Sequence, residues 1–205
     1  KKPTISNLSS PSIKKNMKRP FRFIFVGQLI NRKRVDLLIK AIAALKLQEI
    51  ELWIVGNGTE KKRLQSLANL LLPKKVRWLG VLPIKEIPNV IFQADCLVLP
   101  SRFDGWGAVV SEALLVGTPV VCSDKCGSSI IVQASRVGSI FSANNQESLI
   151  NSLCNQFEKG LVGLKERQKI MKWAKYLDVS SGAKYLELIL NKKNNKLNMI
   201  KLPWN

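Results

Sequence analysis

Residues 96–122 read CLVLPSRFDGWGAVVSEALLVGTPVVC, and this stretch reveals the class of fold. A short apolar run opens it, a polar loop and a helical pattern follow, and a second apolar run closes it. The predicted segments are the strand Cys96–Leu99, the loop Ser101–Gly107, the helix from Ala108 to Val116 and the strand Pro119–Cys122. Gly117 is placed to stop the helix. A strand, a helix and a strand in close succession predict a parallel βαβ unit.

The same alternation continues on both sides of this unit. Upstream, the patterns predict strands at Phe21–Val26, Glu51–Val55 and Val76–Leu79, and helices at Lys33–Leu45, Thr59–Leu71 and Lys85–Ala94. Downstream, they predict a strand at Gly138–Phe141 and helices at Ser128–Ala134, Gln146–Phe157, Val162–Tyr176 and Ser180–Leu190. Thr59 is the expected N-cap of its helix. Short apolar strands that alternate with amphipathic helices predict an α/β fold, a parallel sheet flanked by helices on both faces.

The chain of 205 residues fits one domain with tails. We expect a linker or tail over residues 1–20, a domain over 21–178, and a closing helix with a basic tail over 179–205. Because the chain begins at Lys1 rather than Met, we expect an excised fragment. No signal peptide is visible, and the apolar runs are far shorter than the roughly 18 residues of a membrane span. The aromatic and apolar residues expected in the core include Trp53, Trp78, Trp173, Tyr176, Tyr185 and Leu186.

Basic residues outnumber acidic ones by 33 to 14, which gives a net charge of +19. Such an excess predicts a polyanionic partner, whether nucleic acid, an anionic membrane surface or a phosphorylated substrate. Solvated lysine-rich tails explain the charge equally well, because the lysines cluster near the two ends. Nucleic acid is the less favoured partner, since aromatic residues make up only 7% of the chain and do not interleave with basic ones.

The four cysteines, Cys96, Cys122, Cys126 and Cys154, lack the paired spacing of a zinc site, and the chain has no histidine. We therefore predict no metal site. Buried, reduced thiols in a cytoplasmic protein are the simpler interpretation.

The candidate site lies in the loops that follow the strands, because ligands of parallel sheets bind beyond the carboxyl ends of the strands. These loops are Gly27–Lys33, Gly56–Thr59, Gly80–Pro83 and Ser101–Gly107. The turn at residues 56–58 reads Gly-Asn-Gly and lacks the full GxGxxG pattern, which weakens a dehydrogenase interpretation.

The loop after the fourth strand carries the most chemistry. Asp104 lies in this loop and Glu112 lies about two helical turns further on, so both carboxylates can face one cleft and accept hydrogen bonds from sugar hydroxyls. Gly105 and Gly107 let the backbone approach a ligand closely, and the free N–H groups at the helix start suit a phosphate. Trp106 is expected to pack and shape the loop. The simpler alternative is that Asp104 only caps the helix.

Residues 100–113 resemble the E-x7-E signature of glycosyltransferase family 4, retaining enzymes of the GT-B fold. The chain follows the family pattern Pro-Ser-x-x-Glu-Gly-Phe-Gly-x-x-x-x-Glu-Ala, with Asp104 in place of the first Glu and Trp106 in place of Phe. Residues 117–121 match the Gly-x-Pro-Val-Val that comes next. Residues 27–34 resemble the family's Gly-Arg-Leu-x-x-x-Lys-Gly segment, with Gln28 in place of Arg and Arg34 in place of the last Gly. Residues 55–58 resemble its Val-Gly-x-Gly turn. The resemblance covers roughly residues 21–190 and implies the Rossmann-like, C-terminal, nucleotide-sugar-binding half of a GT-B enzyme.

The resemblance also implies roles for individual residues. Lys33 would neutralise the donor diphosphate, Glu112 would bind the ribose hydroxyls, and Asp104 would bind hydroxyls of the transferred sugar. The backbone of Val81 and Leu82 would contact the base. The other expected donor contacts are Gly27, Gln28, Arg34, Gly105, Trp106, Gly107, Ala108 and Val109, the last two through backbone N–H groups.

The implied substrate is a nucleoside diphosphate sugar of UDP or GDP type, with no further cofactor. A glycan or lipid-linked acceptor would be bound by an N-terminal domain that this sequence lacks, so we expect the chain alone to be incomplete for catalysis. Residues 126–129 read Cys-Gly-Ser-Ser where the family has Gly-Gly-x-x-Glu, which removes one sugar-contacting acid. The expected location is the cytoplasm, with the basic ends able to dock on the inner membrane face. The alternative function is a basic nucleic-acid-binding or non-catalytic nucleotide-binding module.

Overall fold

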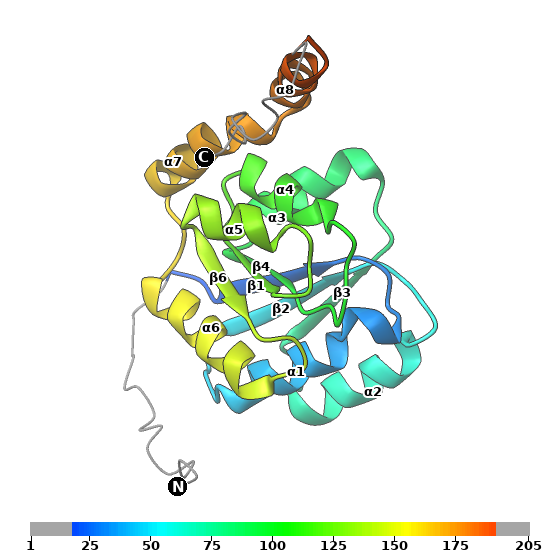
Figure 1. Ribbon diagram of the computed structural model, residues 1–205. Helices are drawn as coiled ribbons and strands as arrows, with labels where there is room; N and C mark the ends of the chain where they lie inside the picture. Colours follow the sequence, from blue (N-terminus) through cyan, green and yellow to red (C-terminus); the bar gives the residue numbers. More distant parts are fainter. Residues whose placement is uncertain (1–17, 192–205) are drawn as a thin grey trace, which may run out of the picture.

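The computed structural model describes residues 18–191, so the tails expected at 1–17 and 192–205 lie outside the described residues. Within the described part, a six-stranded sheet runs in the order β3-β2-β1-β4-β5-β6 (Figure 1). The strands are β1 (Phe21–Val26), β2 (Ile50–Val55), β3 (Val76–Gly80), β4 (Cys96–Leu99), β5 (Val120–Ser123) and β6 (Gly138–Phe141). All neighbouring strands pair in parallel. This arrangement confirms the predicted α/β fold.

The strands are nearly continuous apolar runs because helices cover both faces of the sheet. In β1 the successive residues Phe23, Ile24 and Phe25 all have 0% exposure, although they point alternately to opposite faces. Every residue of β4 and β5 is buried. The core therefore lies on both sides of the sheet, and a ligand can reach the sheet only at the ends of the strands.

Helices α1, α2 and α6 cover one face, and α3, α4 and α5 cover the other (Figure 1). Helix α7 packs on α4, and α8 extends away from the sheet. Their bounds are α1 (Val35–Ala44), α2 (Lys61–Leu71), α3 (Ile87–Phe92), α4 (Ala108–Leu115), α5 (Ser129–Ser135), α6 (Gln146–Lys159), α7 (Leu164–Ala174) and α8 (Val179–Asn191). Short 3-10 segments are η2 (Asn31–Lys33), η3 (Ile84–Glu86) and η4 (Lys175–Leu177). Among these helices, none combines the length and apolarity that crossing a bilayer requires.

The strand order reverses between β1 and β4, which are neighbours in the sheet. The chain leaves β1 toward α1 on one face and leaves β4 toward α4 on the opposite face. Loops that part in this way open a crevice at the carboxyl ends of the two strands. The fold therefore places the loops after β1 and β4 at the best position for a ligand.

Two helix starts were predicted wrongly. The helix expected over Lys33–Leu45 is interrupted, because Arg34 adopts a left-handed conformation with φ of 52° between η2 and α1. Thr59 is not an N-cap, since α2 begins at Lys61 with Glu60 before it and no side-chain cap. The Glu60 N–H donates instead to the Leu29 carbonyl at 2.9 Å, so backbone contacts between two loops set the start of α2.

The core predictions hold in the sheet and fail near the end of the described chain. Trp53 is 4% exposed, and Trp78 and Trp173 are partly buried against the core. Tyr176 and Leu186 are 52% and 55% exposed, because η4 and α8 leave the body of the domain. The side chain of Tyr185 lies outside the described residues. Cys96, Cys122 and Cys126 are buried free thiols as predicted, and Cys154 is half-buried.

Candidate functional site

The loops at the carboxyl edge of the sheet are joined by backbone hydrogen bonds. The Gly56 N–H donates to Gly80 O at 2.6 Å, and the Leu29 N–H donates to Asn57 O at 2.9 Å. Across the switch point, the Arg102 N–H donates to Arg32 O at 2.8 Å. The four loops predicted to form the site therefore make one continuous edge, from β3 through β2 and β1 to β4.

Lys33 and Asp104 form an ion pair across the switch point, between Nζ and Oδ2. Their side chains are only 14% and 12% exposed, so solvent screens the pair incompletely. The Ser101 hydroxyl lies 3.5 Å from the same carboxylate oxygen. Asp104 does not cap α4, since Gly107 is the N-cap residue. Lys33 is equally not a solvated surface lysine, and the pair places a cation and an acid together where the fold favours a ligand.

The start of α4 lies beside this pair. Gly107 has φ of 78° and offers no side chain to cap the helix. The Val110 N–H bonds to Gly107 O at 2.9 Å, whereas the described residues show no backbone acceptor for the N–H groups of Ala108 and Val109. Two N–H groups at the positive end of a helix dipole form a ready site for an anion.

Backbone hydrogen bonds join the loop that carries Asp104 to the loop after β5. The Asp104 N–H donates to Lys125 O at 3.1 Å, and the Gly127 N–H donates to Asp104 O at 3.0 Å. A Cβ added to Gly127 would lie only 2.1 Å from Gly105 O, so only glycine permits this contact. The two loops form a fixed support for the acid and for the start of α4.

Glycine also lets the loops after β1 and β2 approach each other. A Cβ on Gly56 would lie 1.9 Å from Gly27 O, and Gly56 has φ of 130°. The side chain of Lys33 lies over Gly27, with Cε 4.0 Å from the position a Cβ would take there. Gly27 therefore contributes by leaving room for the lysine stem.

Arginines on the same two loops make further contacts, and one of their partners, Asn144, was not predicted from the sequence. Arg34 bonds to Asp36 at 3.1 Å and to the Oδ1 of Asn144, which also accepts from Arg102 Nε at 3.3 Å. Arg32 donates to Phe103 O at 2.7 Å. Asn144 follows β6 with φ of 60°, a conformation that asparagine tolerates. The adjacent asparagines after the last strand were the available signal for this turn.

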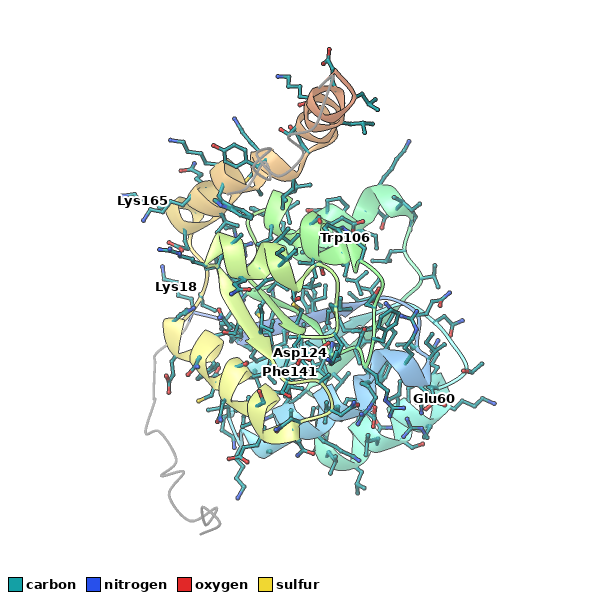
Figure 2. All side chains as sticks on the ribbon, in the orientation of Figure 1. Lys18, Glu60, Trp106, Asp124, Phe141 and Lys165 are labelled. Atoms are coloured by element: carbon teal, nitrogen blue, oxygen red, sulfur yellow. The ribbon has the colours of Figure 1, made fainter. Side chains whose placement is uncertain are left out.

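The remaining predicted residues occupy the same edge with differing exposure. Glu112 is half-buried on α4, and the described residues show no hydrogen bond or ion pair to its carboxylate. Trp106 is 45% exposed and projects beside α4 (Figure 2). Val81 is 74% exposed and Leu82 half-buried after β3, at the far end of the edge, and Gln28 is exposed after β1. The structure joins Lys33 and Asp104 directly, and the loop of Val81 and Leu82 is linked to this edge by the hydrogen bond between Gly56 and Gly80.

In residues 18–191 no three cysteine or acidic side chains gather closely enough to hold a metal ion. Two cavities, of about 450 and 330 Å³, lie away from the carboxyl edge. The larger is lined by Pro119 and Gly138, which are at the amino ends of β5 and β6. Both cavities therefore lie at the opposite end of the strands from the Lys33–Asp104 pair.

The fold is an α/β domain of the Rossmann-like class, and its carboxyl edge is the candidate ligand site. The chain belongs to the family Glycosyl transferases group 1, whose pattern matches residues 9–176. A curated relative, the D-inositol 3-phosphate glycosyltransferase of Corynebacterium jeikeium, is 32% identical over 139 residues. That match covers 63% of this chain and 33% of the relative, so the chain spans about a third of the relative's length.

Solved structures agree with this assignment. HepE from Anabaena, solved in complex with UDP, superposes with a TM-score of 0.73 at 22% identity, over 84% of this chain and 49% of that one. The catalytic domain of cholesterol-alpha-glucosyltransferase from Helicobacter pylori gives a TM-score of 0.66 at 25% identity, over 78% of this chain and 99% of that one. The fold is therefore that of glycosyltransferases of the GT-B type.

Proposed function

We propose that this chain is the donor-binding half of a retaining glycosyltransferase of family 4, which transfers a sugar from a nucleoside diphosphate to a glycan or lipid-linked acceptor. The observation that carries the proposal is the Lys33–Asp104 pair at the switch point, beside the open N–H groups of α4. A cation and helix N–H groups suit a diphosphate, and an acid suits sugar hydroxyls. A site with both features fits a nucleotide sugar, which carries a diphosphate and sugar hydroxyls, better than it fits a diphosphate or a sugar alone.

In this proposal the residues of the edge divide the donor between them. Lys33 and the N–H groups of Ala108 and Val109 hold the diphosphate, where negative charge builds up as the sugar leaves. Asp104 accepts hydrogen bonds from the transferred sugar. Glu112, whose carboxylate has no partner among the described residues, accepts hydrogen bonds from the ribose. The acceptor attacks the anomeric carbon from the same face from which the diphosphate leaves, so the configuration at that carbon is retained.

The acceptor belongs to a second domain in this proposal. The chain covers about half of HepE and a third of the inositol phosphate relative, and HepE was solved with UDP bound. These observations support a donor of the UDP type and an active site completed by residues outside this chain. We place the enzyme in the cytoplasm, with its basic ends near the inner membrane face and a lipid-linked acceptor.

Titration calorimetry with UDP, GDP and ADP tests the proposal. We expect one nucleoside diphosphate to bind measurably, and Glu112→Ala to weaken it about 10-fold or more, because a charge-assisted hydrogen bond contributes roughly 1.5–3 kcal/mol. Glu147→Ala, which removes an exposed acid from α6, serves as the matched control and leaves the affinity unchanged. Equal affinities of the chain and Glu112→Ala would refute the role of Glu112, and binding of none of the three nucleotides would refute the donor site.

The net charge of +19 favours a second candidate function, a nucleic-acid-binding module. Such a module binds RNA or DNA with a steep dependence on salt, and excess UDP does not compete. Fluorescence anisotropy with a labelled oligonucleotide, with and without UDP, separates the two functions. The donor-site proposal predicts that any oligonucleotide binding at the carboxyl edge is displaced by UDP.

A further inference from the structure

Ser128 holds a buried hydroxyl that has no hydrogen-bond partner among the described residues. The residue is 0% exposed and lies between β5 and α5. A buried polar group without a partner lowers stability, so native structures keep few of them, and each calls for an explanation such as a functional role or a bound water or ion. Two other buried serines in the described part of the chain satisfy their hydroxyls. Ser123 donates to Ser101 O at 2.6 Å, and Ser135 donates to Val132 O at 2.8 Å.

The hydroxyl of Ser128 faces the start of α4. A Cβ added to Gly107, the N-cap residue, would lie 3.0 Å from Ser128 Oγ and 3.8 Å from the carboxyl carbon of Asp104. The same point is 2.8 Å from a methyl group of Leu99. The hydroxyl therefore lies directly beneath the glycine of the helix N-terminus and on the same side as Asp104. A side chain at position 107 would press against it.

The turn over Ser128 has open space on its outer side. Gly105 is exposed, and a Cβ on it would meet nothing within 4 Å. The Ser128 N–H donates to Trp106 O at 2.8 Å, which keeps the serine in register with the turn. Gly107 therefore lies next to the hydroxyl and directly precedes the N–H groups of Ala108 and Val109. Because the Ser128 side chain is fully buried, contact with an anion at these N–H groups requires residues 105–107 to shift.

We propose that the Ser128 hydroxyl donates a hydrogen bond to a phosphate oxygen at the start of α4, as a third donor beside the N–H groups of Ala108 and Val109. This inference rests on the proposed donor site and adds to it a residue that no acid or cation pattern indicates. The missing partner of the hydroxyl is then a phosphate of the nucleoside diphosphate. Loss of the hydroxyl should weaken diphosphate binding without weakening the fold.

The test compares Ser128→Ala with Ser135→Ala, a buried serine of α5 whose hydroxyl also accepts from the Val137 N–H at 3.1 Å. Melting temperature and calorimetric affinity for UDP are measured for both variants and the parent chain. Ser128→Ala should keep or raise the melting temperature and weaken UDP about 10-fold or more, the factor expected for loss of a hydrogen bond to a charged phosphate. Ser135→Ala should lower the melting temperature and leave UDP affinity unchanged.

The alternative is that the hydroxyl holds only an internal water molecule. In that case Ser128→Ala lowers the melting temperature and binds UDP as the parent chain does, and this result overturns the inference while the donor site stands. If the parent chain binds neither UDP nor GDP, the donor site itself is refuted and the inference with it. The two failures are therefore told apart by the parent chain's own titration.

Discussion

Lys33 and Asp104 neutralise each other at the switch point, yet the proposal assigns them to different parts of the donor. The diphosphate must therefore compete with Asp104 for the lysine. Asp104→Asn removes the competitor, and we predict that UDP, which carries no sugar, binds about 3- to 10-fold more tightly, the effect of weakening one ion pair by roughly 1 kcal/mol.

A double-mutant cycle checks this prediction. In the chain with Lys33→Met, the further change Asp104→Asn should bring no gain in UDP affinity, because the competing cation is already gone. An equal gain with and without Lys33 would show that Asp104 opposes the diphosphate directly by charge repulsion and not by holding the lysine.

The rate at which each of the four cysteines is alkylated tests how deeply its thiol is buried. Burial raises the pKa of all four thiols above the usual range, and a thiolate rather than a thiol attacks alkylating reagents. Cys96, Cys122 and Cys126 are buried, whereas Cys154 on α6 is half-buried. We predict that a short pulse of N-ethylmaleimide at pH 8 labels Cys154 first, as read by peptide mass spectrometry. All four should react at similar rates in urea, and early labelling of Cys126 in the folded chain would contradict its burial in the site.

At the scale of elements, the glycine contact between the loops after β1 and β2 fixes the geometry of the edge. Gly56→Ala forces a Cβ to within 1.9 Å of Gly27 O in a left-handed backbone conformation. We predict a loss of about 2 kcal/mol or more in the free energy of unfolding, measured by urea denaturation. Gly182→Ala in α8 is the control, because open space surrounds it and alanine favours helix; it should stabilise the chain or leave it unchanged. Comparable losses for both variants would show that the contact does not matter.

Most elements were predictable because apolar runs and helical spacing record burial directly. The strands β1, β4 and β6 match their predicted bounds, and the Lys33–Asp104 pair joins two of the loops that were indicated by their position after predicted strands. Local turn chemistry was harder. Arg34, which is left-handed, contacts Asn144, and the residue before α2, Glu60, contacts Leu29. Both partners lie far away in sequence. Ser128 could not be singled out, because a missing partner is visible only once its surroundings are known.

At the scale of the whole molecule, we propose that the domain binds the donor at its carboxyl edge and that the acceptor binds to a second domain. We predict that residues 1–205 bind a nucleoside diphosphate but transfer sugar to a glycan or lipid acceptor at a rate close to background. A radiolabelled UDP-sugar assay with a mixture of acceptors measures this. Robust transfer by the chain alone would mean that the described fold already holds a complete active site.

We infer that the edge at the β1–β4 switch point binds a diphosphate through Lys33. Titration of UDP into the parent chain, Lys33→Met and Lys40→Met measures this role, since Lys40 is an exposed lysine on α1 that carries the same charge. We expect Lys33→Met to weaken UDP binding at least about 10-fold, the effect of losing one charge-assisted hydrogen bond, while Lys40→Met binds as the parent does. Equal affinity of all three chains for UDP would show that Lys33 does not hold the diphosphate.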